Sequence, residues 1–327
     1  MSDTALNRPA SPSRLMGAIK SLLSQPPAYL GIVLLLGFAA ITRPNLMSPL
    51  LLMLILRQAA PLGLVTIGQS LVVRCRSVDF SSGGIMVAVS YLLTSGVVTA
   101  PLPVMLALAV ALGCLVGLAN GLIITRIRAS AVIVTIAMGT ILTGIVIALS
   151  QIRAQGDVPP MLADLGRLRV GMMPVITFVW LALLIPGVFL RFTVFGRVMD
   201  ASGANPEAAE ISGLPFLRVV LIAHVISGLT AALAACVLLS FVGVGSLSIG
   251  DEIALNALAA TILGGVNFGN GKGGMLGPAV AAFMLMFLFN LLTSFGLGEA
   301  GRLTLQGAIV GGAALVYSMR NGQSTHS

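Results

Sequence analysis

The chain has 327 residues, of which 57% are hydrophobic and 9% are charged, and its formal net charge is +8. Soluble domains carry about 25% charged residues, so this composition excludes a soluble globular protein and indicates that most of the chain lies in a membrane. Three cysteines are too few for a disulfide framework, and two histidines provide few ligands for a metal site. The positive charge is not gathered in a basic block, which is more typical of cytoplasmic loops in a membrane protein than of nucleic-acid binding.

The first 25 residues are polar and basic, and two interpretations of them stay open. They form either a disordered tail or an amphipathic helix on the membrane surface, which Ser13 would cap and which would place Leu15 and Ile19 on one side. Ten apolar segments follow, and each is a candidate membrane span. These segments run at about 28–42, 50–73, 83–100, 102–125, 131–150, 174–192, 217–242, 253–266, 274–295 and 303–319.

The arginines and lysines predict the orientation of these segments, because cytoplasmic loops of membrane proteins are enriched in both. With the N-terminus inside, twelve of the 18 basic residues fall on the cytoplasmic side, five fall outside, and Arg57 lies within the second segment. The even number of segments returns the C-terminus to the cytoplasm. The chain therefore divides into a cytoplasmic tail at 1–25, a transmembrane domain at 26–320 and a cytoplasmic tail at 321–327, with the main external loop at 151–173.

Glycine forms two kinds of pattern in this sequence. Gly113, Gly117 and Gly121 recur every four residues in the fourth apolar segment, and this spacing predicts close packing against a neighbouring helix. Glycine-rich polar stretches at 81–84 and 264–274 interrupt the apolar pattern instead. Such stretches are either simple loops or interrupted segments of the kind that transporters place near a substrate path.

The main internal loop, 193–216, contains the signals of a short helix with two defined ends. Asn205 is a good N-cap, Pro206 suits the first turn, and Glu207 complements the helix dipole. Gly213 can end the helix in the left-handed conformation. A capped helix between two membrane segments suits docking into a groove of another protein, and an ordinary structured loop is the alternative.

Polar side chains inside the apolar segments are candidates for a substrate path, because they are costly in lipid unless they face a neighbour or a cavity. They are Gln69, Ser70, Asn120, Thr135, Thr140, His224, Asn256, Asn290 and Gln306. We select the four amides Gln69, Asn120, Asn256 and Asn290 as the candidate translocation path. Hydrogen bonding between helices is the alternative for each of them, and Asn120 lies beside Gly121 on the glycine stripe, where packing is favoured.

The sequence contains no recognisable catalytic or metal-binding constellation. The string nearest to a phosphate-binding P-loop, at 266–273, has Val266 where the first glycine belongs and Gly273 where the hydroxyl residue belongs. We therefore expect that this chain is not an enzyme, holds no cofactor or metal, and does not hydrolyse ATP.

Five stretches resemble, in the same order, the ribose-type permeases, which are the membrane subunits of bacterial ABC importers for simple sugars. They are RQAAPLGLVTIGQSLVV (57–73), SVDFSSGG (77–84), GLANGLIITRIRASAVIVTIAMGTILTGI (117–145), GRVMDASGANPEAAEISGLPFLRV (196–219) and DEIALNALAATILGGVNFGNGKGGMLGP (251–278). The resemblance covers about residues 50–320. It implies an all-α polytopic transmembrane helix bundle of about ten spans with a short cytoplasmic coupling helix, located in the bacterial inner membrane with both termini in the cytoplasm.

The resemblance also implies partners. They are an ABC ATPase subunit that uses ATP and Mg²⁺, a second permease chain in a homodimer or heterodimer, a periplasmic sugar-binding protein, and the lipid bilayer. The residues that match the coupling motif, and that the resemblance implies as the ATPase contact, are Gly203, Asn205, Glu207, Ala208, Ala209, Ser212 and Gly213.

Two positions depart from the pattern of the family. Family members carry a glycine-rich stretch before the aspartate at position 79, whereas this chain reads Arg74-Cys75-Arg76-Ser77-Val78 there. Asn256 stands where the family has an aspartate. Two alternatives to a sugar permease stay open: a permease for branched-chain amino acids or nucleosides, and an ATP-independent carrier, which would normally need ion-coupling carboxylates in mid-membrane.

Overall fold

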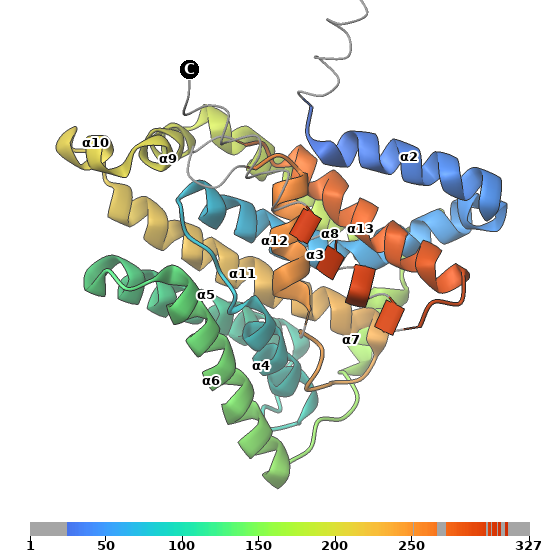
Figure 1. Cartoon of the computed structure of the whole chain (residues 1–327). Helices are drawn as coiled ribbons and strands as arrows, with labels where there is room; N and C mark the ends of the chain where they lie inside the picture. The colour runs from blue at the N-terminus through green and yellow to red at the C-terminus, as the bar shows by residue number, and fades with distance from the viewer. Residues whose placement is uncertain are drawn as a thin grey trace, which may run out of the picture.

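The protein is a bundle of α-helices in a computed structural model that describes residues 25–250, 252–266 and 273–298 and parts of 300–312 (Figure 1). Within these residues, five helices are long and apolar enough to cross a membrane: α3 (Pro49–Arg74), α5 (Leu102–Ile127), α6 (Ala131–Ile152), α11 (Phe216–Val242) and α13 (Leu276–Ser294). A sixth candidate is a pair bent by 69°, in which α8 (Thr177–Phe189) and η2 (Leu190–Phe192) lead into α9 (Val194–Ala204).

The other elements are shorter. Three of them are apolar helices: α2 (Pro27–Thr42), α4 (Ser82–Thr94) and α12 (Ile253–Leu263). The rest are η1 (Pro44–Met47), α7 (Pro160–Arg167), β1 (Arg169–Val170), β2 (Met173–Pro174) and α10 (Pro206–Ile211). The two strands form a small antiparallel hairpin in which Arg169 lies opposite Pro174.

Nine of the ten predicted apolar segments coincide with a helix, and the tenth, 303–319, lies largely outside the described residues. Residues 1–24 and 313–327, which hold the two predicted tails, also lie outside them. Among the described residues, five helices are long enough to be membrane spans, or six if the bent pair is one span. Helix length alone therefore does not confirm the ten spans that the sequence predicts. The reason is that α2, α4 and α12 have 16, 13 and 11 residues, fewer than the roughly 20 that a straight crossing needs.

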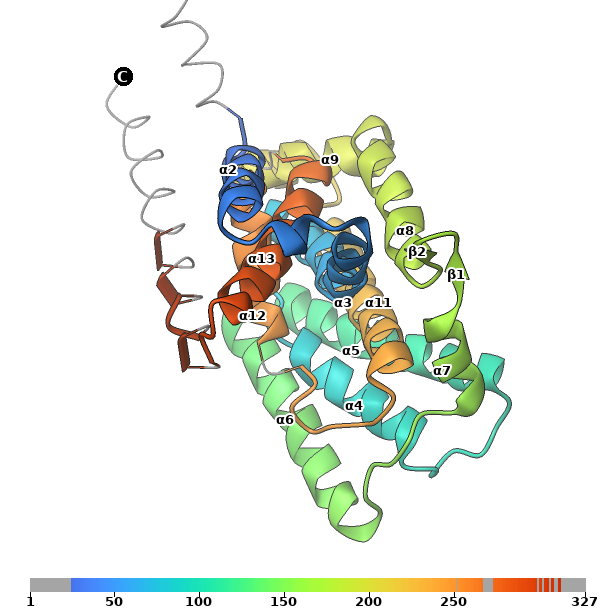
Figure 2. The ribbon, with the colours of Figure 1, turned by 90° about the vertical axis from the view of Figure 1, so that its right-hand side faces the viewer.

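Helix α11 lies at the centre of the bundle, against α3, α4 and α5 (Figures 1 and 2). The glycine stripe of α5 makes this packing close. A Cβ atom at Gly113 would overlap the carbonyl oxygen of Gly228, and one at Gly117 would overlap the carbonyl oxygen of His224. The prediction that the stripe is a packing surface is therefore confirmed.

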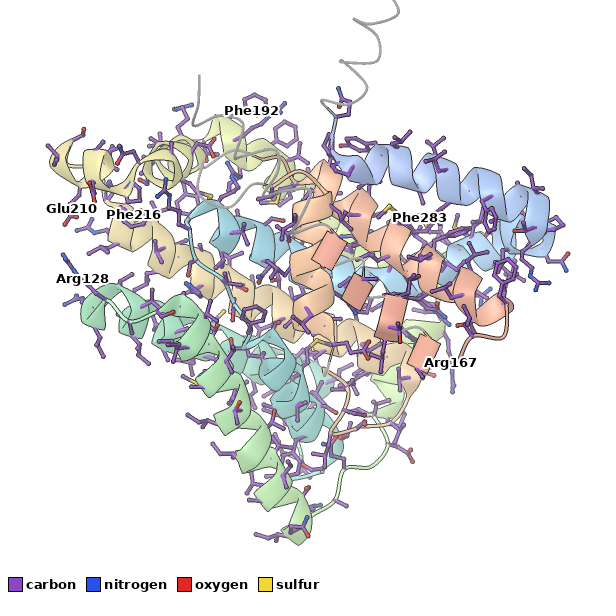
Figure 3. The ribbon with its side chains drawn as sticks, viewed as in Figure 1. Arg128, Arg167, Phe192, Glu210, Phe216 and Phe283 are labelled. Atoms are coloured by element: carbon purple, nitrogen blue, oxygen red, sulfur yellow. The ribbon has the colours of Figure 1, made fainter. Side chains whose placement is uncertain are left out.

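The two ends of α11 mark two opposite sides of the molecule. Phe216, at its start, lines a cavity together with residues of α10, whereas Ser240, near its end, packs against Gly166 of α7. Figure 3 shows the same separation, with Arg128 and Glu210 at one side and Arg167 at the other. The loops at 193–216 and 151–173 thus lie on opposite sides of the bundle.

Candidate functional site

The predicted capped helix is present as α10. The Asn205 side chain accepts a hydrogen bond from the Ala208 backbone nitrogen at 3.0 Å, and Pro206 occupies the first helical position. At the other end Gly213 has φ +72°, and the Leu214 nitrogen donates to the Ala209 carbonyl at 2.9 Å. These contacts are all local in sequence, which is why the sequence pattern was sufficient to predict both ends of this helix.

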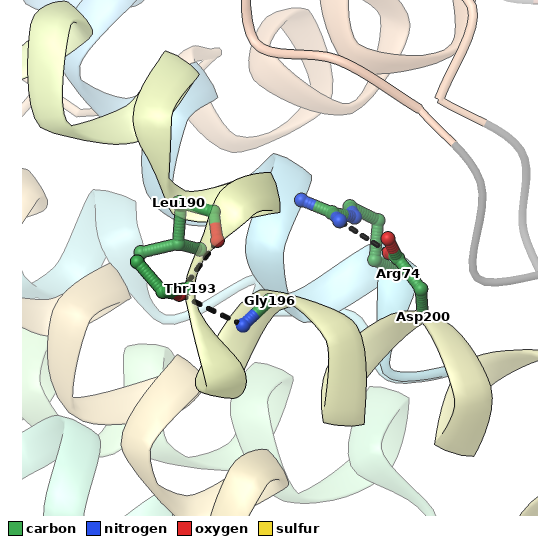
Figure 4. A network of polar contacts seen from close by, with 5 residues as sticks. All are labelled: Arg74, Leu190, Thr193, Gly196 and Asp200. Carbon is green, nitrogen blue, oxygen red and sulfur yellow. Dashed lines mark hydrogen bonds and ion pairs between the residues drawn. The ribbon is translucent and has the colours of Figure 1, made fainter.

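Helix α9, which leads into α10, was not predicted. It begins at Thr193, whose hydroxyl donates to the Leu190 carbonyl at 2.6 Å and accepts from the Gly196 nitrogen at 3.1 Å (Figure 4). The hydroxyl three residues before Gly196 is the sequence signal that could have located this start. Together, α9 and α10 form one projecting unit, which we call the docking element (194–211).

The seven residues implied as the partner contact fall into two groups. Asn205, Glu207, Ala208, Ser212 and Gly213 are exposed, and Gly203 and Ala209 are buried. Sequence reasoning missed Ile211, whose side chain is 88% exposed beside them. Ile211 thus adds an exposed aliphatic side chain to the surface that these five residues form.

Two arginines at the end of α3 contact this docking element. The Arg74 side chain is buried, with 1% of its residue surface exposed, and it forms an ion pair with Asp200 of α9 (Figure 4). Arg76 has a left-handed backbone, with φ +58°, and its guanidinium donates to the Gly203 carbonyl at 2.7 Å and the Ala204 carbonyl at 2.8 Å. A left-handed non-glycine residue costs about 1–2 kcal/mol, which these bonds to the end of a helix offset.

Cys75 lies between the two arginines and is buried. Burial raises the pKa of its thiol to about 12, and the nearby Asp200 carboxylate adds to this effect while the Arg74 cation opposes it. The thiol is therefore neutral and weakly nucleophilic in the folded protein.

The chain from position 77 to position 81 is non-helical and almost wholly buried, whereas residues 82–84 already belong to α4, so the interruption predicted at 81–84 lies a few residues earlier than expected. Its polar groups pair with one another and with neighbouring helices. The Ser77 hydroxyl contacts His224 Nε2 at 2.8 Å, and Asp79 accepts bonds from the nitrogen and hydroxyl of Ser81 at 2.9 and 2.6 Å. Asn120 donates to the Ser81 hydroxyl at 2.8 Å, which makes it part of this buried network.

The other three candidate path amides lie apart from this network. Asn290 donates to Gln58 at 2.9 Å and to the Met286 carbonyl at 2.9 Å, which is hydrogen bonding between and within helices. Gln69 and Asn256 are both buried. Neither polar atom of the Gln69 side chain has a hydrogen-bond partner among the described residues, and the Oδ1 atom of Asn256 has none either. The Oδ1 of Asn120 also lacks a partner among the described residues, so Gln69 is the only one of the four amides in which both polar atoms are buried without a bond, and an unsatisfied buried amide is costly.

A cavity of about 390 Å³ lies between α4 and α6, and we call it the α4–α6 cavity. It is lined by Phe80, Gly83, Gly84, Val87, Ile136, Gly139, Thr140, Thr143, Gly144, Ile147, Gly250 and Ala254. Its volume is typical of small-molecule sites. Thr140 was among the predicted polar residues, but none of the four selected amides lines this cavity.

Glycine pairs bring the walls of this cavity together. A Cβ atom at Gly84 would meet the backbone of Gly139, and one at Gly83 would meet the carbonyl of Gly250. The glycine-rich stretch at 81–84, which forms the start of α4, was the sequence signal for this site, but its partners on α6 and before α12 could not be identified from local pattern. Among the described residues, no group of three or more His, Cys, Asp or Glu side chains is placed to hold a metal ion.

The chain is similar to known proteins over almost its whole length. The model of a family described as branched-chain amino acid transport system / permease component matches residues 51–316. The ribose import permease of Bacillus subtilis (strain 168) is 30% identical over 293 residues, which cover 86% of this chain and 89% of the relative.

Two further relatives carry different names. The L-arabinose ABC transporter permease of Azospirillum brasilense is 27% identical over 96% of this chain and 93% of its own length. The autoinducer 2 import system permease protein of Enterobacter sp. (strain 638) is 30% identical over 83% of this chain and 79% of its own length. No solved structure matches.

Proposed function

Because this chain belongs to the branched-chain amino acid transport system / permease component family, we propose that it is the membrane-spanning permease of an ATP-driven ABC importer for a simple sugar. The observation that carries this proposal is the near full-length similarity to permeases named for ribose and L-arabinose. The exposed, doubly capped α10 supports it, because it offers a docking surface on one side of the bundle.

The proposed topology has about ten spans in the inner membrane and both termini in the cytoplasm. Helices α2, α4 and α12 would supply three of the spans beyond those that length alone identifies. Helix α4 follows a buried non-helical stretch, which adds to the length of the crossing. Non-helical backbone at membrane depth is tolerated where protein covers it or where it lines a cavity.

The proposed mechanism is alternating access without covalent chemistry in this chain. A separate ATPase subunit would bind ATP and Mg²⁺, dock on Asn205, Glu207, Ala208, Ser212 and Gly213, and close on nucleotide binding. The buried Gly203 and Ala209 would hold the docking element to the bundle. A periplasmic binding protein would deliver the sugar on the opposite side, where α7 lies.

The α4–α6 cavity is the proposed substrate path, with Gln69 and Asn256 as additional candidates. The hydroxyls of Thr140 and Thr143 could bond to a sugar there. Helix α6 is largely exposed, so a second permease chain, of the same or a different sequence, could complete the wall of this path.

Copurification and reconstitution test the proposal. The permease is extracted gently from native membranes, copurifying ATPase is identified, and uptake into proteoliposomes is measured with binding protein for ribose, L-arabinose, L-leucine and uridine. We expect ATP-dependent uptake of a sugar. Uptake of leucine or uridine alone would move the assignment to the alternative substrates, and uptake without ATP would move it to an independent carrier.

The Glu207→Arg variant tests the docking site separately. Reversing the charge in the first turn of α10 opposes the helix dipole and any complementary charge on the partner. We expect the ATPase to be lost from the purified complex while the permease stays in the membrane. The matched variant Asp164→Arg, on exposed α7 at the opposite side, should keep the ATPase.

A further inference from the structure

The strongest polar contacts of the docking element are with the end of α3. Arg74 is the largest fully buried side chain among the described residues, and its charge is paired with Asp200 of α9. A buried cation is strongly destabilising when its partner is removed, so this ion pair resists separation of α9 from α3.

Arg76 makes the second attachment. Its guanidinium donates to the carbonyls of Gly203 and Ala204, which are the last residues of α9. Cations at a helix C-terminus bond carbonyls that lack an intrahelical partner and complement the helix dipole. The two arginines therefore hold the middle and the end of the same helix.

Apolar packing joins α9 to α3 as well, because Met199 of α9 is buried in one cluster with Leu71 and Val72 of α3. A cavity of about 330 Å³ lies between α10 and the end of α3, and its walls include Cys75, Arg76, Pro206, Glu207 and Phe216. The guanidinium groups bridge to α9 beside this space. The docking element is thus fastened to α3 through α9, by an apolar cluster around Met199 and by the two arginines.

The same segment continues into the wall of the α4–α6 cavity. Only Ser77, Val78 and Asp79 separate Arg76 from Phe80, the first residue that lines that cavity. Ser77 and Asp79 are fixed by the buried network with His224 and Ser81. If Arg76 moves, the backbone of residues 77–80 therefore carries the movement to Phe80 in the cavity wall.

We propose that Arg74 and Arg76 are positioning residues that fasten the docking element (194–211) to the segment 77–84, so that partner movement is transmitted to the α4–α6 cavity. This inference rests on the proposed function. It also gives a role to the two arginines that depart from the glycine-rich pattern of the family.

The first test uses Asp200→Asn, which keeps the size of the side chain and removes its charge. Asp200 is partly exposed, so this change leaves less of the core disturbed than a change at Arg74. In proteoliposomes with ATPase and binding protein, we expect sugar taken up per ATP hydrolysed to fall about tenfold. Asp200→Glu should restore coupling, because it returns a carboxylate to Arg74.

The second test uses Arg76→Gly and a readout that is independent of transport. Glycine adopts the left-handed backbone of position 76 without strain, so this variant removes the guanidinium bonds and keeps the turn. Cys75 is the reporter. We expect N-ethylmaleimide, followed by peptide mass spectrometry, to label Cys75 faster in Arg76→Gly and Asp200→Asn than in the unsubstituted protein or Asp164→Asn.

The outcomes separate this inference from the proposed function. If the unsubstituted protein shows no ATP-driven uptake, the importer proposal fails, while the labelling of Cys75 still tests the attachment. If uptake is ATP-driven, and Asp200→Asn and Arg76→Gly both keep the normal uptake per ATP and the normal Cys75 labelling, the positioning role is overturned. If Asp200→Asn does not reach the membrane, Arg76→Gly alone decides.

Discussion

Gly213 and Gly171 are two glycines with the same backbone requirement on opposite sides of the molecule. Their φ angles are +72° and +61°, and neither has a neighbour that a Cβ atom would meet. A side chain at either position costs about 1–2 kcal/mol through backbone strain alone. They differ in the element that each serves. Gly213 follows the last residues of α10, and Gly171 lies in the turn of the β1–β2 hairpin.

We therefore expect Gly213→Val to abolish ATP-driven uptake, because strain at the end of α10 distorts the proposed docking surface, while the protein still inserts into the membrane. Gly171→Val is the matched control and should keep most of the uptake. Transport assays with immunoblots of the membrane fraction measure both effects. Equal loss in the two variants would show that strain itself, rather than docking, is responsible.

Cys75 provides a pH prediction at the same scale. Burial raises the pKa of its thiol to about 12, so the reactive thiolate is scarcer at any given pH than in an unfolded chain. Labelling of the native protein by N-ethylmaleimide should stay slow at pH 7–8.5. The same protein unfolded in detergent should label rapidly near pH 8.5. Fast native labelling at pH 8 would contradict the buried position.

At the scale of elements, the contact between α5 and α11 depends on the absence of side chains. A methyl group at Gly117 would overlap the backbone of His224, whereas Gly37 on α2 has open space around its Cβ position. We expect Gly117→Ala to destabilise the protein by about 1–3 kcal/mol through overpacking. Gly37→Ala should be neutral or slightly stabilising, because alanine favours the helix. Unfolding in detergent, followed by circular dichroism, compares the two.

The helices that could be predicted from the sequence are those whose signals are local. Apolar runs located nine helices, and Asn205 with Gly213 located both ends of α10. Helix α9 was missed because Gly196, Ser202 and Gly203 weaken its propensity, and because its contacts come from Arg74 and Arg76, more than a hundred residues earlier.

The candidate site was predictable to a smaller extent. The α4–α6 cavity is built where Gly84 meets Gly139 and Gly83 meets Gly250, and no local pattern pairs residues so far apart. The four amides were selected because polar side chains are costly inside apolar segments. Asn120 and Asn290 nevertheless bond to neighbouring side chains, so a polar residue in an apolar segment does not by itself distinguish a substrate path from hydrogen bonding between helices.

At the scale of the whole molecule, the bundle has two distinct sides, and their assignment to cytoplasm and periplasm can be tested. Ser130, in the turn between α5 and α6, lies beside Arg128, which faces α10, and Met172 lies in the hairpin on the other side. Both side chains are exposed. In a variant without the three natural cysteines, a membrane-impermeant thiol reagent should label Met172→Cys in intact spheroplasts and Ser130→Cys only after lysis. The reverse pattern would invert the proposed orientation.

Helix α11 connects those two sides without a break. It has 27 residues and is therefore about 40 Å long. Its first turn follows the docking element after only the residues 212–215, and its last turn packs against α7. A rigid rod of this length acts as a lever, in which a rotation of about 5° at one end displaces the other by about 3.5 Å. A small adjustment where a partner docks would thus be amplified into a movement at the far face that is large enough to admit or exclude a water molecule.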